Sequence, residues 1–314
     1  MAQQQARKQK KVRLTTLEEY PPEDPTLINI GNAEHSVSGL PEGYPSSPAE
    51  AQALILKAFS PMDDDVDKAL NSSTRPLRKA KTIYQDRVVR IRALEGGSKV
   101  LFVSFTGIGH QLGGLQTDEF IGTIHDGGKN TALFVSDMQR LWYNHANLVP
   151  QALRTIWTIQ DDLQPKKVVA IGNSMGGFGA ILFSRMINAD TVIAISPQFS
   201  VCDEIVPEED RWREFRQRIK MYRYPDIAHA FGNKTQYFVF SGVVPEERRH
   251  MDRLPDARNI HKFYVPNQGH SLAAVFKENG IQKRIVSSCY TLPPMIADMR
   301  IRRLLKKTFG GKAS

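Results

Sequence analysis

The chain has 314 residues, of which 41% are hydrophobic, and its formal net charge is +9. That size suffices for one sizeable domain with a real core, and no run of about 18 apolar residues predicts a transmembrane helix. The basic first residues, MAQQQARKQKKVR, lack an apolar core, so no signal peptide is expected. With two cysteines and no zinc-type spacing, we expect a cytoplasmic protein without a disulfide framework, a metal or another cofactor.

The positive charge is concentrated at the two ends of the chain. Residues 1–13 carry five basic side chains and residues 300–314 carry six, with no acid in either segment. These eleven exceed the whole net charge of +9, so the body is slightly acidic and no specific nucleic-acid partner is expected. The tails are predicted to be solvated termini. The alternative is weak contact with an anionic polymer or membrane, which would place the protein at the periphery of the inner membrane.

Residues 1–80 form the first predicted unit, made of the basic tail, an extended arm and short helices. Residues 14–50 are rich in Pro, Gly, Ser and Glu, which is typical of an arm without its own core. A serine cap followed by Pro48 predicts the start of a short helix. An acid-rich helical turn is expected in the stretch PMDDDVDKAL.

Residues 81–290 are predicted to form an α/β domain. Strands are expected within 82–94 (one or two), and at 99–107, 131–137, 167–171, 190–197, 236–242 and 261–267. Helices are expected at 147–163, after the glycine-rich stretch that follows residue 171, and from about 271. Such alternation predicts a mostly parallel sheet with helices on both faces.

Two further segments complete the predicted organisation. Residues 198–230 interrupt the alternation with a charged, aromatic-bearing segment, predicted to be a helical insertion. Residues 291–314 are a basic C-terminal segment, which can form an amphipathic helix of its own or pack on the domain.

The stretch AIGNSMGGFGA, residues 170–180, places Ser174 between a β-branched run and a helical pattern. Gly172 and Gly176 flank the serine as G-x-S-x-G. A tight strand-to-helix turn forces strained backbone angles and leaves no room for flanking side chains. It also exposes a hydroxyl beside free N–H groups, which favour the oxyanion of a tetrahedral intermediate.

This stretch resembles the nucleophile elbow of the α/β-hydrolase superfamily, and the resemblance covers about residues 82–285. The family's chain order of nucleophile, acid and histidine implies His270 as the base, in NQGHS just past the last strand. It implies an acid after strand 236–242. Glu246 is the first choice, with Glu247 and Asp252 as alternatives.

The same resemblance implies donors for the oxyanion, and the residues around the remaining histidines give their expected places. The oxyanion N–H groups are expected from Met175 and from Ile108 or Gly107. Of the other histidines after the serine, His261 is expected in the sheet and His250 on a solvent-facing helix. A pocket over Ser174 would be roofed by the insertion.

Aromatic and basic side chains are candidates for contact with a substrate. Trp212, Tyr222 and Trp142 are the substrate-binding candidates, with core packing as the alternative for Trp142. Four arginines of the insertion, Arg211, Arg213, Arg216 and Arg218, would meet an anionic substrate or form a solvated face.

The stretches SDMQRLWYN, GNSMGGFGAILFS and AISPQFS resemble bacterial α/β-hydrolase-like proteins associated with surface-polysaccharide pathways. The resemblance implies a serine esterase with a Ser-His-acid triad and an acyl-enzyme, acting on a small-molecule ester or an acylated saccharide. The alternatives are an acyltransferase with the same triad, or a non-catalytic binding or assembly protein in polysaccharide biosynthesis or export.

Overall fold

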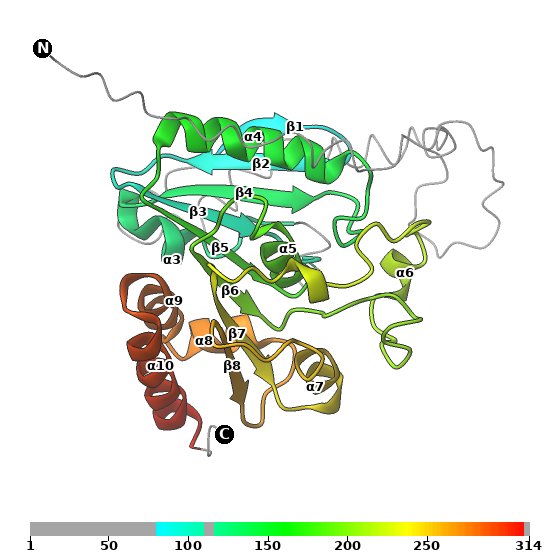
Figure 1. Ribbon diagram of the computed structural model, residues 1–314, viewed down its shortest axis with the longest axis vertical. Helices are drawn as coiled ribbons and strands as arrows, with labels where there is room; N and C mark the ends of the chain where they lie inside the picture. Colours follow the sequence, from blue (N-terminus) through cyan, green and yellow to red (C-terminus); the bar gives the residue numbers. More distant parts are fainter. Residues whose placement is uncertain (1–79, 110–115, 311–314) are drawn as a thin grey trace, which may run out of the picture. The chain divides into compact units, whose positions relative to one another are not determined.

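The computed structural model describes residues 80–109 and 116–310. They form one sheet of eight strands with helices on both sides (Figure 1). The strands are β1 Lys81–Gln85, β2 Val89–Leu94, β3 Val100–Phe105, β4 Thr131–Asp137, β5 Lys167–Asn173, β6 Thr191–Ile195, β7 Gln236–Gly242 and β8 Ile260–Val265.

The order of the strands across the sheet is β1-β2-β4-β3-β5-β6-β7-β8. Strand β2 runs antiparallel to both of its neighbours, and every pairing from β4 to β8 is parallel. This order, with a serine turn after β5, defines an α/β-hydrolase fold. The expected mostly parallel sheet is therefore confirmed, and residues 82–94 contain two strands joined at Asp86, which accepts the N–H groups of Val88 and Val89.

Helices cover the two faces of the sheet because alternate strand residues point to opposite sides. On one face Val103 and Ala170 pack with α4, Leu148–Leu163, and α5, Met175–Phe183. On the other face, Phe102 and Val169 pack with a second group of helices. These are α8, Leu272–Glu278, α9, Gln282–Thr291, and α10, Pro294–Phe309, together with the short α3, Ile121–His125.

The C-terminal segment packs on the domain, which is one of the two alternatives that its sequence left open. Helix α10 buries Ile301, Leu304 and Leu305 in the same core as Phe102 and Val169, and it contacts α9 and β8. The predicted arm and short helices of residues 1–79 lie outside the described residues. Within the described residues, no helix combines the length and the apolar character that crossing a bilayer requires.

The insertion is less helical than its sequence predicts. Between residues 198 and 230 the regular elements are the four-residue α6, Arg213–Arg216, and the 3₁₀ turn η5, Ala228–Ala230. The buried Arg216 donates to the carbonyls of Val201, Glu209 and Arg211, so a side chain holds this backbone in place of helical hydrogen bonds.

The turn between β5 and α5 requires two glycines. Ser174 has φ 56° and ψ −125°, a strained conformation for a residue with a side chain. A Cβ on Gly172 would lie 2.0 Å from the carbonyl oxygen of Gly176, and a Cβ on Gly176 would lie 2.0 Å from that of Phe105. The expected position and strain of Ser174 are therefore observed, and β3, β5 and α5 meet through bare backbone.

We predict that Gly176→Ala destabilises the protein by about 3 kcal/mol or prevents folding, because the new methyl group overlaps a backbone oxygen that cannot move alone. The matched control is Gly122→Ala in α3, where a new Cβ meets nothing within 4 Å. There alanine should be neutral or stabilising by up to about 1 kcal/mol. Urea unfolding of both variants measures the difference, and equal stability would contradict the close approach.

Candidate active site

Three side chains from separate parts of the chain meet beside the β5–α5 turn. The Oγ of Ser174 lies 2.8 Å from His270 Nε2, and His270 Nδ1 lies 2.9 Å from an Oε1 atom of Glu247. Ser174 comes from the strained turn, Glu247 from α7, Pro245–Met251, and His270 from the loop after β8. A serine hydroxyl, an imidazole and a carboxylate in contact in this order are the groups that nucleophilic catalysis by a serine requires.

The structure brings Glu247, not the first-choice Glu246, to His270. Consecutive residues on a helix point roughly 100° apart, so only one of the pair can face the histidine. Glu247 is 2% exposed, whereas Glu246 is exposed. Asp252 is occupied elsewhere, with Arg248 and the hydroxyl of Tyr264. The sequence alone does not distinguish Glu246 from Glu247 as the partner of His270, because the choice depends on which side of α7 faces the histidine.

A glutamine that the sequence analysis missed fixes the direction of the serine proton. Gln198, fully buried after β6, donates from Nε2 to Ser174 Oγ at 3.2 Å. Its orientation follows from Trp142, whose indole N–H can only donate and reaches Gln198 Oε1 at 3.1 Å. Ser174 Oγ thus accepts from Gln198, so its own proton points to His270.

The loop after β4 holds Trp142 in place. The buried Asp137 accepts N–H groups from Gln139, Leu141 and Tyr143. Trp142 and Tyr143 both have positive φ, 48° and 61°, so this carboxylate stabilises backbone that is otherwise strained. Trp142 is 0% exposed, so it reaches the site through Gln198 and offers no surface for a substrate.

The predicted oxyanion groups differ in whether their N–H groups are free. Gly107 donates its N–H to Glu119 Oε1 at 2.8 Å, so that group is occupied. Met175 is the first residue of α5, where an N–H has no acceptor within its own helix. Within the described residues neither Met175 nor Ile108 donates its N–H to a protein acceptor. These two N–H groups remain the candidates.

The loop after β3 is held by a hydrogen bond to the carboxyl group of Glu119. Removal from water raises the pKa of the Glu119 carboxyl to about 7, although the N–H of Gly107 opposes the shift. A Cβ on Gly107 would lie 2.9 Å from Glu119 Oε1 and 3.1 Å from the carbonyl oxygen of Asn173. The loop after β3 therefore runs close against the end of β5.

A chain of charged groups extends from Glu247 into the insertion. Arg211 Nη1 lies 2.5 Å from Glu247 Oε1, and the same guanidinium binds Glu209 through Nε at 2.8 Å and Nη2 at 2.5 Å. Burial raises the pKa of the Glu247 carboxyl, but His270 and Arg211 outweigh it and hold that pKa below its usual value. For Glu209 burial is likewise outweighed, by Arg211 and His250, and its pKa is lowered.

His250 ends this chain, and its predicted exposure to solvent is wrong. It is 2% exposed, with Nε2 2.7 Å from Glu209 Oε2. Its Nδ1 accepts the N–H of Phe199, so Nε2 carries the proton and the ring is neutral. Burial lowers the pKa of His250, and Glu209 opposes the shift. The insertion covers this side of α7, which the polar pattern of α7 could not reveal.

Trp212 is the predicted substrate residue that the structure places at the site. Its ring centroid lies 4.8 Å from that of His270 and 6.0 Å from that of Trp142, and Arg211 stacks on it at 4.5 Å. The side chain of His270 is 28% exposed while Ser174 is 6% exposed, so solvent reaches the site beside His270. Tyr222 instead donates to the carbonyl of Val201 and packs on the core beneath α4 and α5.

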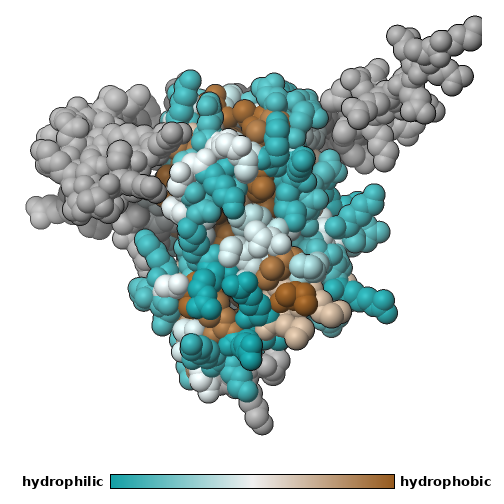
Figure 2. Space-filling model, turned by 90° about the vertical axis from the view of Figure 1, so that its left-hand side faces the viewer, coloured by the Kyte–Doolittle hydropathy of each residue, from teal (hydrophilic) through white to brown (hydrophobic). Residues whose placement is uncertain are grey.

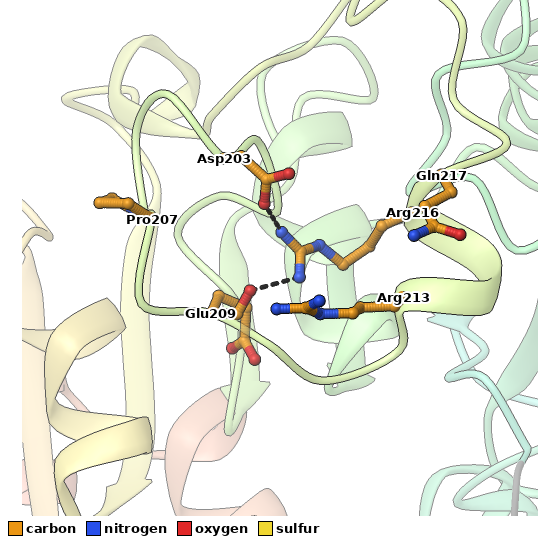
Figure 3. A pocket seen from close by; sticks show the side chains of 6 residues that line it. All are labelled: Asp203, Pro207, Glu209, Arg213, Arg216 and Gln217. Atoms are coloured by element: carbon orange, nitrogen blue, oxygen red, sulfur yellow. Dashed lines mark hydrogen bonds and ion pairs between the residues drawn. The ribbon is translucent and has the colours of Figure 1, made fainter.

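A pocket of about 280 Å³ lies within the insertion, lined by Asp203, Pro207, Glu209, Arg213, Arg216 and Gln217 (Figure 3). Arg216 pairs with Asp203 there, so two of the charged groups neutralise each other. None of these residues belongs to the Ser174–His270–Glu247 set. Among the described residues no group of His, Cys, Asp or Glu side chains is arranged to hold a metal ion.

Comparison with known proteins finds matches among solved structures alone. No family model matches the chain, and no curated protein matches it. Among solved structures, the capsule O-acetyltransferase of Neisseria meningitidis serogroup A is 16% identical, with TM-score 0.48 over 65% of this chain and 93% of that one. An α/β serine hydrolase without a lid from Xanthomonas campestris is 10% identical, with TM-score 0.44 over 68% and 96%.

A third match is the glycosylation-associated Gap123 complex of Streptococcus agalactiae, 12% identical, with TM-score 0.46 over 75% of this chain and 48% of that one. At these identities and scores, the likeness says nothing of the activity of this chain.

We predict that Arg211→Gln costs about 3 kcal/mol of stability, because it leaves Glu247 and Glu209 buried beside a neutral group. The dependence of stability on pH should also change, from a loss on acidification in the natural protein to a gain in the variant. In the natural protein the two carboxyl groups have lowered pKa values, so their contribution to the free energy of unfolding is fully present down to about pH 5. That contribution is lost only when the pH falls below the ordinary carboxyl pKa of 4.5. In the variant unpaired burial raises those values, so acidification from about pH 7 to about pH 5 should increase stability.

The control is Arg248→Gln, whose ion pair with Asp252 is solvent-exposed. Urea unfolding should show a change within about 0.5 kcal/mol and no new pH dependence. An Arg211→Gln variant with the natural stability and the natural pH slope would contradict the buried bridge.

Proposed function

We propose that the protein is a serine hydrolase that cleaves carboxylic esters through an acyl-enzyme, with Ser174 as nucleophile, His270 as base and Glu247 as acid. The observation that carries the proposal is the unbroken contact from Ser174 Oγ through both ring nitrogens of His270 to Glu247. A serine hydroxyl is a weak nucleophile unless an adjacent base removes its proton, and this contact supplies one.

The direction of each hydrogen bond gives the proton path. Gln198 donates to Ser174 Oγ, so the hydroxyl proton faces His270 Nε2, and Nδ1 then donates to Glu247. When Oγ attacks the acyl carbon, His270 takes the proton and later gives it to the leaving alcohol. Glu247 holds the ring in the required tautomer and stabilises the imidazolium.

The oxyanion that forms on the acyl carbonyl needs donors that are already in place. We assign this role to the N–H of Met175, at the positive end of α5, and to the N–H of Ile108. Glu119 acts on this loop indirectly, because it holds the N–H of Gly107 next to Ile108. Glu119 is thus a positioning residue for the oxyanion loop.

The acyl-enzyme can be released by water or by another hydroxyl group, and the substrate class that we propose is an acylated saccharide. The open side of the site supports it. Trp212 lies partly exposed beside His270, and the exposed part of an aromatic side chain can pack against a sugar ring. Assays with a saccharide acceptor, in which ester transfer is measured beside hydrolysis, distinguish the esterase from an acyltransferase.

We predict that Ser174→Ala and His270→Ala each lower kcat/KM on a short p-nitrophenyl ester by about 10⁴-fold or more, and that the double variant is hardly worse. Glu247→Gln should cost about 10³-fold, because the imidazole loses its orienting partner. The matched control is Glu246→Gln on the exposed neighbour, which should retain nearly full activity.

A fluorophosphonate probe tests the nucleophile directly. We expect labelling of the natural protein and none of Ser174→Ala. Absence of labelling and of ester cleavage in the correctly folded natural protein would support a non-catalytic binding protein instead. If Glu246→Gln is the more damaging change, the acid is misassigned while the serine mechanism stands.

We predict that Trp142→Phe lowers kcat about tenfold to a hundredfold with little change in KM, because the amide of Gln198 loses the N–H that orients it. The matched control is Trp157→Phe, which removes an indole N–H that donates to the carbonyl of Met186 at 3.0 Å, away from the site. Trp157→Phe should lose about 1 kcal/mol of stability, and Trp142→Phe about 2 kcal/mol, because Trp142 is fully buried and the smaller ring leaves a cavity. Equal activity of the two variants would contradict the role of Gln198.

A further inference from the structure

Helix α10 has an outward face that is apolar at its start. Its inner face is buried in the core through Ala297, Ile301, Leu304 and Leu305. On the outward face Met295 is 74% exposed, Ile296 49% and Met299 63%. These three side chains, which we call the α10 patch, are the most exposed of the large hydrophobic side chains in the described residues.

The rest of the outward face is cationic. Arg300, Arg303, Lys306 and Lys307 are all exposed and follow the α10 patch over the next two turns. The one acid of α10, Asp298, already pairs with Arg302 and His261. Figure 2 shows this side of the molecule, where brown and tan atoms gather low on the face, next to teal hydrophilic groups.

We propose that α10 attaches the protein to the surface of an anionic phospholipid bilayer. The apolar start of the helix would enter the boundary between headgroups and acyl chains, while the four cations would contact lipid phosphates. The helix has 16 residues and one buried face, so it lies in the plane of the interface and does not span the membrane. An anionic bilayer surface offers contacts to both the α10 patch and the four cations, and the two lie next to each other on one helix.

Other occupants fit the same surface less well. Three exposed side chains are far less than the roughly 800 Å² per partner that a stable dimer buries, and the cations would repel a second copy. A nucleic acid or another polyanion would contact the basic residues but would gain nothing from exposed methionine and isoleucine. The α10 patch therefore favours the lipid surface.

The test is co-sedimentation of the full chain with vesicles of phosphatidylcholine alone and of phosphatidylcholine mixed with an equal amount of phosphatidylglycerol. We expect binding to the mixed vesicles only, weakened by salt. Lys306→Gln with Lys307→Gln should weaken it about fivefold for each charge removed. Ile296→Gln with Met299→Gln should weaken it about tenfold or more.

A matched control removes two exposed lysines elsewhere, Lys166→Gln with Lys234→Gln, and should bind like the natural protein. Circular dichroism and thermal unfolding confirm that each variant is folded. Equal binding by the α10 variants and the natural protein would overturn the proposal, since the attachment would then come from another segment such as the basic residues 1–13. Binding to phosphatidylcholine alone, or no binding at low salt, would also overturn it, and so would a dimer in light scattering that the α10 patch variants abolish.

Discussion

The close approach of three backbone segments at the end of β5 is the constraint on which the site depends. Gly172 and Gly176 allow β5, α5 and the end of β3 to meet without side chains between them. This contact fixes the strained angles of Ser174 and brings the loop after β3 alongside the first N–H groups of α5. One packing contact therefore sets the positions of the proposed nucleophile and of its proposed oxyanion donors, and the surrounding hydrophobic cores hold the strained turn in place.

The charged insertion contributes in a different way, through burial of ions. Arg211 and Glu209 leave water when the insertion covers α7, and a buried charge is costly unless it is fully paired. Here each guanidinium nitrogen has a carboxylate oxygen, and Glu209 also accepts from His250. The pairing explains why an arginine-rich segment with little helix adopts one structure. It also makes the position of the insertion and the position of Glu247 depend on each other.

The sequence patterns predicted those features of the fold and site that depend on residues close together in the chain. The alternation of apolar runs and helical periods indicated the parallel sheet, and G-x-S-x-G marked the turn because only glycine fits there. The chain order placed His270, which lies 2.8 Å from Ser174. The choice between Glu246 and Glu247 failed because it depends on which face α7 turns to the sheet. Likewise, burial of His250 and the contact of Gln198 with Ser174 arise from segments distant in sequence, which no local pattern encodes.

The charges around the proposed acid have a consequence for catalysis. Arg211 and His270 bind the same oxygen of Glu247, so the arginine reduces the negative charge available to an imidazolium. Taken alone, this pairing would weaken the electrostatic role of the acid. Glu209 restores the balance, because Glu247, Arg211, Glu209 and a neutral His250 together carry one net negative charge. The arginine thus holds Glu247 ionised and oriented, while the second carboxylate supplies the charge that the arginine cancels. The insertion is therefore part of the electrostatics of the site as well as its cover.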